Sequence, residues 1–346
     1  MSGIVYNQIR QILFTQDSER VHHAALSLAA LAKAAPARQF LEFLFLLKDK
    51  RLQCTAAGLH FQNPVGLAAG FDKNAQAFDF FRALGFGHVE LGTITAQPQS
   101  GNPKPRIFRL PDDRALINRM GFPSDGADKV AARLKARGRV SGDPILGINI
   151  GKTKVVSIDE AAADYCKSFA TLEQYADYVT LNVSSPNTPE LRKLQEPARL
   201  KELFRSIQEL NLRKIPLFVK IAPDLTEGEV DEILDMVLGA GISGIIATNT
   251  TFSREGLKTQ IEETGGLSGA PLTLRSRAMI QRLASKVQGK IALIGVGGIM
   301  CASDAKAMLD SGASLVQIYT GLVYEGPGFV REILRHLLAA NEGEGW

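Results

Sequence analysis

Three asparagine-centred segments are the part of this sequence best suited to chemistry. They are residues 182–188 (Asn-Val-Ser-Ser-Pro-Asn-Thr), residues 118–122 (Asn-Arg-Met-Gly-Phe) and the pair Asn249 and Thr250. An asparagine amide both donates and accepts hydrogen bonds, which suits a flat ligand whose edge alternates C=O and N–H groups. Lys73 and Lys220 add positive charge for a carboxylate or for a developing anion. Together these residues predict a substrate that carries an imide or amide.

Two glycine-containing segments late in the chain predict a phosphate site. Residues 294–299 read Ile-Gly-Val-Gly-Gly-Ile, and residues 315–321 end in Tyr-Thr-Gly. Each runs from an expected strand into an expected helix, where glycine lets backbone N–H groups approach an anion. The first segment does not complete a dinucleotide fingerprint, because Met300 stands where the last glycine belongs. Lys152 and Thr153 end a P-loop-like run, but Leu146 replaces its first glycine.

From residue 64 onward, short β-branched runs alternate with helical patterns, which predicts a parallel sheet covered by helices. Eight such units match a closed (β/α)₈ TIM barrel, for which about 250 residues is typical, and an open doubly wound sheet is the structural alternative. The expected strands are residues 65–69, 88–91, 145–150, 178–182, 217–221, 244–247, 291–296 and 315–319. The expected helices are residues 75–84, 125–137, 159–171, 197–210, 226–239, 272–288, 302–310 and 329–340.

Polar or glycine residues lie at the carboxyl end of every expected strand. They are Lys73, Thr93, Asn149, Asn182, Lys220, Thr248, Asn249, Gly297, Gly298, Tyr319 and Thr320. Any one of them could be a turn residue or a helix cap. Because all eight strands end this way, and because barrels of this type carry their active sites at that face, the pattern favours a functional site.

The composition is that of a folded globular protein. Of 346 residues, 45% are hydrophobic and 22% charged, and the net charge of +4 does not suggest a nucleic-acid binder. Cys54, Cys166 and Cys301 stand far apart, so we expect neither a disulfide framework nor a metal site, and a reducing compartment fits best. We find no apolar run long enough to span a membrane and no signal-peptide pattern.

The first 48 residues differ from the rest of the chain. They predict three short helices: one around residues 4–13, one capped by Asp17 and Ser18 and ended by Pro36, and one in the apolar run 40–47. Their apolar surface leaves two interpretations open, an interfacial membrane anchor or a helical arm that packs on the core or on a second copy. We therefore divide the chain into an extension, residues 1–48, and a barrel domain, residues 49–346.

Together these segments resemble the dihydroorotate dehydrogenases, in particular the membrane-associated, quinone-dependent class. The resemblance covers nearly the whole chain and rests on residues 68–74, 90–93, 101–106, 117–122, 149–152, 182–188, 248–251, 264–269 and 295–299. It implies a barrel with FMN at its carboxyl-terminal mouth, which oxidises (S)-dihydroorotate to orotate in de novo pyrimidine (UMP) biosynthesis. Electrons then pass to a membrane quinone. Ser185 stands where the cytosolic class has cysteine, and this, with the extension, favours the quinone class.

The resemblance also implies roles for individual residues. FMN is held by Ala69, Gly70, Lys73, Thr93, Asn149, Asn182, Lys220, Thr248, Gly269, Gly298, Tyr319 and Thr320. The substrate is held by Lys73, Asn118, Arg119, Met120, Gly121, Phe122, Asn182, Asn187, Asn249 and Thr250. Ser185 is the base that removes the C5 proton while the C6 hydride goes to flavin N5. Quinone contacts fall on His22, Arg109 and Tyr319.

The resemblance further implies a peripheral membrane protein on the cytoplasmic face of a bacterial cell membrane. Contact is expected through residues 1–48, without nucleic acid or an obligate protein partner. Two other functions stay open: a flavin enzyme of the same fold with a soluble electron acceptor and an oligomer-forming arm, and a non-catalytic flavin- or phosphate-binding barrel. No histidine neighbours Ser185, so substrate binding, water exclusion or a relay through a threonine or water must activate it.

Overall fold

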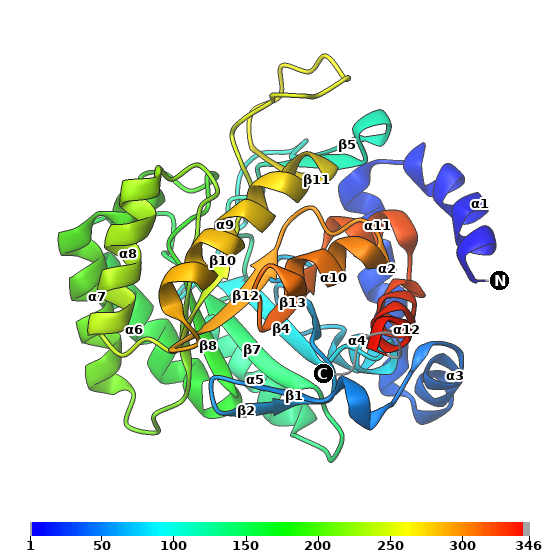
Figure 1. The fold of residues 1–346 in the computed structure, drawn as a ribbon, viewed down its shortest axis with the longest axis horizontal. Coiled ribbons are helices and arrows are strands. Elements are labelled where there is room, and N and C mark those ends of the chain that lie inside the picture. The colour runs from blue at the N-terminus through cyan, green and yellow to red at the C-terminus, as the bar shows by residue number, and fades with distance from the viewer. Residues whose placement is uncertain (1, 342–346) are drawn as a thin grey trace.

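Eight parallel strands close into a barrel in the computed structural model, which describes residues 2–341 (Figure 1). The strands follow the order β10-β12-β13-β3-β4-β7-β8-β9 around the ring. Their bounds are β3 Val65–Leu67, β4 His88–Ile94, β7 Ile145–Ile150, β8 Tyr178–Asn182, β9 Leu217–Ile221, β10 Gly244–Ala247, β12 Ala292–Val296 and β13 Leu315–Ile318. The predicted closed barrel is therefore confirmed, with each strand within a few residues of its expected place, and the open-sheet alternative is wrong.

Helices surround the barrel on its outer face (Figure 1). They are α4 Phe78–Ala83, α5 Ala127–Arg137, α6 Ala161–Leu172, α7 Pro197–Leu210, α8 Glu227–Gly239, α9 Thr273–Val287, α10 Ala302–Asp310, α11 Thr320–Glu325 and α12 Phe329–Asn341. Short 3₁₀ turns occur at Ala30–Lys33, Lys50–Leu52, Pro111–Asp113, Glu173–Tyr175, Leu191–Gln195 and Ala270–Leu272. The six-residue α11 was not expected from the sequence, because so short a helix carries no periodic signal.

Aromatic rings fill part of the barrel interior, and two glycines make room for them. A Cβ on Gly147 would lie 2.1 Å from the ring of Tyr178, and one on Gly66 would lie 2.0 Å from the imidazole of His88. Burial lowers the pKa of His88 to about 3, so this ring packs as a neutral group. The barrel interior around these two rings is therefore a packed core.

Two small antiparallel sheets were missed in the sequence. β1 (Cys54–Ala56) and β2 (Leu59–Phe61) form a hairpin, while β5 (Ile107–Leu110), β6 (Ala115–Asn118) and β11 (Gly266–Gly269) form a three-stranded sheet. Their strands have only three or four residues and lie outside the regular alternation of strands and helices that revealed the equally short barrel strands. The glycine-rich β11 is moreover a poor strand former in isolation and gains its structure by pairing with β6 across about 150 residues of chain.

The N-terminal helices lie together at one side of the barrel (Figure 1). They are α1 Ser2–Phe14, α2 Ser18–Ala29 and α3 Ala35–Phe45. Asp17 caps α2 as expected, accepting a hydrogen bond of 2.8 Å from the backbone N–H of Arg20. Pro36 does not end α2 but lies in the first turn of α3, where its missing N–H costs no hydrogen bond. Among the helices of residues 2–341, none is long and apolar enough to cross a bilayer.

A buried ion pair holds α2 against the barrel domain. Glu19 and Arg106 are 4% and 7% exposed, and their closest nitrogen–oxygen distance is 2.7 Å. Arg106 also donates to the carbonyls of Ser100 and Asn102, both at 2.7 Å. Although burial raises the pKa of Glu19, the hydrogen bonds and charge of Arg106 outweigh it and lower that pKa to about 2. A charged pair without access to water is costly to break on one side only.

The Glu19→Gln variant should therefore loosen the extension. We expect the free energy of unfolding at pH 7 to fall by about 3 kcal/mol, because Arg106 is left buried without its counter-charge. Chemical denaturation measures this loss, and limited proteolysis should cut α2 faster than in the parent. Glu19 contributes its stabilisation fully above pH 4.5 and loses it as pH falls towards 2, so the difference between variant and parent should shrink over that range.

Glu42→Gln is the matched control, because Glu42 also lies in the extension. Its carboxylate is 26% exposed and stands 3.9 Å from both Arg38 and Arg82, so we expect a loss below about 1 kcal/mol. Equal behaviour of the two variants would contradict the role given to the Glu19–Arg106 pair.

Candidate active site

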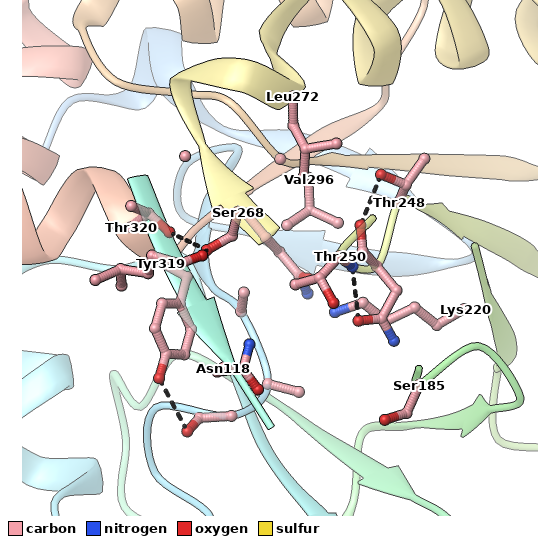
Figure 2. Close-up of a pocket in the computed structure, with 18 of the residues that line it drawn as sticks. Asn118, Ser185, Lys220, Thr248, Thr250, Ser268, Leu272, Val296, Tyr319 and Thr320 are labelled. Carbon is pink, nitrogen blue, oxygen red and sulfur yellow. Dashed lines mark hydrogen bonds between the residues drawn. The ribbon is translucent and has the colours of Figure 1, made fainter. Parts of the chain in front are cut away.

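A cavity at the carboxyl ends of the barrel strands collects most of the residues expected there. This mouth cavity contains about 1130 Å³ of space free of atoms, its opening included. The expected residues that line it are Ala69, Gly70, Lys73, Thr93, Asn118, Met120, Gly121, Phe122, Asn182, Ser185, Asn187, Lys220, Thr248, Asn249, Thr250, Gly269, Gly298, Tyr319 and Thr320. Ser185 and Lys220 come from neighbouring parts of the ring and approach the cavity from the same side (Figure 2).

Two expected residues do not line the mouth cavity. Asn149 lies one layer deeper and is fully buried, where its side-chain oxygen accepts a hydrogen bond of 2.6 Å from the Thr93 hydroxyl. Arg119 directs its guanidinium to the carboxylate of Glu263 and stacks over the ring of Phe108, at 4.7 Å from the ring centre. Arg119 therefore holds the loop that carries Glu263, while its neighbours Asn118 and Met120 face the cavity.

Lys73 and Lys220 bring positive charge to the cavity, and few negative charges lie near enough to balance it. Lys220 is 5% exposed and forms no ion pair within 4 Å in the described part of the chain. Burial lowers its pKa, and the negative charge of Glu90 opposes this shift. Burial likewise lowers the pKa of Lys73 to about 8, with Asp72 opposing, so Lys73 is still mostly protonated at neutral pH. Both ammonium groups suit an anionic ligand.

The asparagine segments predicted to act together do converge. The Asn187 side chain donates to the Asn118 side-chain oxygen at 3.2 Å, joining the loop after β8 to the end of β6. The Asn249 side chain donates to the Ser184 hydroxyl at 2.9 Å, joining the loop after β10 to the same β8 loop. Amide groups from three separate segments of the chain therefore meet around one space, as hydrogen-bond recognition of a flat ligand requires.

Ser185 lies in this asparagine cluster, and in residues 2–341 its hydroxyl accepts a hydrogen bond but donates none. It is 5% exposed, and its Oγ accepts a hydrogen bond of 3.3 Å from the backbone N–H of Asn187. Two nearby threonine hydroxyls, of Thr188 and Thr250, are buried without a hydrogen-bond partner in residues 2–341. Unpaired buried hydroxyls are unfavourable, so these two groups point to a ligand or to bound water that completes the site.

The turn after β12 has the backbone needed for an anion. Gly297 and Gly298 have φ angles of 111° and 75°, which side-chain-bearing residues rarely adopt. Both line the mouth cavity, and a Cβ on Gly298 would lie 2.2 Å from the backbone nitrogen of Thr273. Across the cavity, the hydroxyls of Ser268 and Thr320 are 2.9 Å apart (Figure 2). This arrangement fits the phosphate group of a nucleotide cofactor.

Several residues that line the mouth cavity were given no individual role from the sequence. They are Ala68, Ile107, Leu116, Ser268, Leu272, Val296, Gly297, Ile299, Met300, Gln317, Ile318 and Gly321. Most are apolar or lie on the unrecognised β5, β6 and β11 sheet, so neither chemistry nor strand pattern singled them out. The sequence did signal some of them: Val296, Gly297 and Ile299 lie in the predicted phosphate segment 294–299, and Ser268 lies in the quoted segment 264–269.

A second, apolar cavity lies between the N-terminal helices and the barrel. This side cavity contains about 1580 Å³ of atom-free space and is lined by His22, Arg109 and Tyr319, the three expected quinone contacts. Ile107, Leu116 and Tyr319 line both cavities, so these three residues form a shared wall between the two spaces. Its remaining lining is mostly alanine, leucine and phenylalanine, which suits an apolar molecule.

His22 and Arg109 differ in how they are held. Burial, and next the charge of Lys73, lower the pKa of His22 to about 3, so the ring is neutral and packs 5.3 Å from Phe71. Arg109 donates to the backbone carbonyls of Leu13 and Gln16, both at 3.0 Å, and so fixes the turn between α1 and α2. The side cavity thus offers one neutral imidazole and one cation to a polar head group.

Comparisons with known proteins agree over nearly the whole chain. The dihydroorotate dehydrogenase family model matches residues 51–340. A dihydroorotate dehydrogenase (quinone) of Gloeobacter violaceus is 48% identical over 342 residues, which are 99% of this chain and 96% of the relative. One of Streptomyces griseus is 49% identical over 95% of this chain and 92% of the relative. A crystal structure of DHODH from Eimeria tenella in complex with ferulenol has a TM-score of 0.87 at 39% identity, covering 94% of this chain and 92% of that one.

Proposed function

The chain belongs to the dihydroorotate dehydrogenase family, and on this premise we propose how its two cavities divide the work of a quinone-linked flavoenzyme. The family resemblance seen in the sequence motifs is confirmed. The protein is a flavin-dependent oxidoreductase that oxidises dihydroorotate to orotate in pyrimidine biosynthesis, with a quinone as electron acceptor. The observation that carries the division is the shared wall: Ile107, Leu116 and Tyr319 separate a polar cavity from an apolar one.

The mouth cavity is the proposed FMN site. Its donor set fits this group: the Gly297–Gly298 turn and Thr320 suit the phosphate, while the unpaired Lys220 ammonium suits the electron-rich edge of a reduced flavin. When bound, FMN accepts the substrate hydride and delivers the electrons to the quinone. Thr93, Asn182 and Thr248 line the same space and complete the proposed cofactor contacts.

The chain's own residues bind and deprotonate the substrate. Asn118, Asn187 and Asn249 present converging amides to the pyrimidine ring, and Lys73 pairs with the substrate carboxylate. Ser185 is the proposed acceptor of the C5 proton. Because a serine hydroxyl is a weak base, its own proton must pass on to solvent. The unpaired hydroxyl of Thr188 in the same loop is the candidate relay, which would accept this proton through a bridging water and release its own.

The side cavity is the proposed quinone site. Its apolar lining accommodates the ring and tail of the quinone, while His22 and Arg109 face the polar head group. The neutral state of His22 allows it to act as either donor or acceptor towards a carbonyl or hydroxyl oxygen. Tyr319 lines both cavities, so it would separate a flavin in the mouth cavity from a quinone in the side cavity.

The extension, residues 1–48, is the proposed membrane contact and the roof of the side cavity, with residues 49–346 as the catalytic domain. Seven of the thirteen large apolar side chains that are exposed in the described residues lie between Ile9 and Leu44. Apolar side chains gathered on short helices favour a position at the membrane surface, where the quinone is dissolved. A peripheral location on the cytoplasmic face of the cell membrane belongs to the same proposal.

The central test is the reaction of the purified protein with dihydroorotate. We expect a yellow protein that releases FMN on denaturation and whose visible band bleaches anaerobically with dihydroorotate and returns with a quinone. Ser185→Ala should slow bleaching by about 100-fold or more, the usual range for loss of a catalytic base. Stopped-flow absorbance measures the rate.

Ser168→Ala is the matched control for this test. Ser168 is also a buried serine, but it lies on α6 outside the mouth cavity, so its variant should bleach at the parental rate. A parent protein that never bleaches would favour the non-catalytic barrel, and equal rates for the parent and Ser185→Ala would remove Ser185 from the mechanism.

Filling the side cavity should slow the reduction of quinone without slowing the oxidation of dihydroorotate. Val21 lines this cavity on α2, and an indole there occupies quinone space. In Val21→Trp we expect quinone reduction to fall about tenfold, the cost of overpacking by one side chain, while bleaching by dihydroorotate stays unchanged. Ala24→Trp, on the exposed face of the same helix, should affect neither half-reaction. Unchanged quinone reduction in Val21→Trp would instead favour a soluble acceptor that bypasses this cavity.

Membrane binding should depend on the apolar face of the extension. Phe43 on α3 is 82% exposed, and Phe43→Asp should lower binding to phosphatidylcholine–phosphatidylglycerol vesicles about tenfold, because one aromatic anchor is lost. Co-sedimentation measures the bound fraction. Leu212→Asp changes an equally exposed apolar residue outside the extension and should bind as the parent does. A similar loss in both variants would argue against a specific membrane face.

A further inference from the structure

A fully buried carboxylate lies inside the barrel, below the mouth cavity. Glu90 on β4 is 0% exposed, and its carboxylate accepts three hydrogen bonds from three other strands. The donors are the Asn149 side-chain nitrogen at 2.8 Å, the Tyr178 hydroxyl at 3.0 Å and the Gln317 side-chain nitrogen at 2.8 Å. A buried acid with neutral partners is costly in a barrel core, where apolar side chains are the usual filling. Its position therefore calls for a functional reason.

All three partners donate, which is the arrangement that an ionised carboxylate requires. Burial, and next the negative charge of Glu90, hold the pKa of Tyr178 well above its usual value, so this phenol stays a donor. In residues 2–341, Glu90 forms no ion pair within 4 Å. The cation that it does influence is Lys220, whose pKa its charge raises against the effect of burial.

The carboxylate fixes the direction of a hydrogen-bond chain that leads into the site. Because Asn149 must turn its nitrogen towards Glu90, its oxygen faces the Thr93 hydroxyl and accepts from it at 2.6 Å. Having donated, the Thr93 hydroxyl accepts from the Asn182 side-chain nitrogen at 2.8 Å. Either amide of this hydrogen-bonded series could by itself exchange the positions of its oxygen and nitrogen. Because the carboxylate at the buried end of the series can only accept, one orientation remains for each amide.

The same chain ends on groups that face the ligands. Because Asn182 turns its nitrogen inward, its oxygen accepts from the Ser184 hydroxyl and the Asn249 side-chain nitrogen, both at 3.2 Å. Asn249 then turns its own oxygen to the backbone N–H of Thr250 at 2.8 Å. Glu90 does not line the cavity, yet through Asn149, Thr93 and Asn182 it determines which atoms of Asn249 donate and which accept hydrogen bonds beside the substrate.

We propose that Glu90 is a positioning residue for the dihydroorotate site, which fixes the donor–acceptor polarity of the hydrogen-bonded series Asn149, Thr93, Asn182 and Asn249. The inference rests on the proposed function of the mouth cavity. Glu90 acts through these side chains without touching either ligand. Removing its charge while keeping its shape should therefore disturb recognition and the flavin potential together.

Glu90→Gln tests this inference, because glutamine has the same shape but can donate as well as accept. We expect the dissociation constant for orotate, followed by the shift of the visible flavin band, to rise about tenfold, the effect of one mispaired buried hydrogen bond. We also expect the flavin midpoint potential to rise, because loss of a nearby negative charge favours the reduced, anionic state. Neither readout depends on turnover.

Asp164→Asn is the matched control. Asp164 on α6 is another buried carboxylate with neutral donors, the backbone and hydroxyl of Thr153 at 2.7 and 3.0 Å, but it lies outside the barrel interior. Its variant should lose stability and keep the parental orotate affinity and flavin potential. If Glu90→Gln matches this control in both readouts, Glu90 is only structural and the inference is overturned.

Glu90→Asp keeps the inference testable if the glutamine variant does not fold. Aspartate retains the charge but is one methylene too short to reach all three donors, so we expect weaker orotate binding with a near-parental potential. Parental orotate affinity in this variant would overturn the assigned polarity role. A parent protein without flavin, or without any spectral response to orotate, would instead count against the proposed function itself.

Discussion

Closure of the parallel barrel is the constraint on which the rest of the structure depends. A ring of eight parallel strands brings all their carboxyl ends to one rim, so loops far apart in sequence must meet there. Thr93 and Thr320, separated by more than two hundred residues, line the same cavity for this reason. Deeper in the barrel, the side chains of Tyr178 and His88 fill the space beside Gly147 and Gly66.

The second constraint is that the chain must handle a polar and an apolar reactant side by side. The N-terminal helices pack beside the barrel and enclose the apolar side cavity. This cavity and the polar mouth cavity share the wall formed by Ile107, Leu116 and Tyr319. The Glu19–Arg106 pair fixes one of these helices, α2, to the barrel domain. The backbone carbonyl of Asn102 accepts a hydrogen bond from Arg106, and the side chain of Asn102 donates one to the backbone carbonyl of Asn187. The ion pair that holds α2 is therefore linked to the loop after β8.

In the proposed substrate site, amide side chains carry most of the recognition. An amide side chain is ambiguous because either its oxygen or its nitrogen can face a partner. A buried carboxylate removes this ambiguity at a cost in desolvation, which illustrates how a polar core can be retained for specificity rather than for stability. Glu90 occupies that position here, linked to Asn182 through Asn149 and Thr93. The packing of the lower barrel and the chemistry of its mouth are thus coupled through one network.

The sequence by itself determined the eight strands, the polar residues at their ends and the family, because long β-branched runs and strand-end motifs are local signals. It did not give the β5, β6 and β11 sheet, because its strands have only four residues each and β11 pairs with β6 across about 150 residues of chain. It placed Arg119 with the substrate, yet tertiary contacts turn that side chain to Glu263. Glu90 stood in a quoted motif without a role, because the three donors that define it come from separate strands and meet only when the barrel closes.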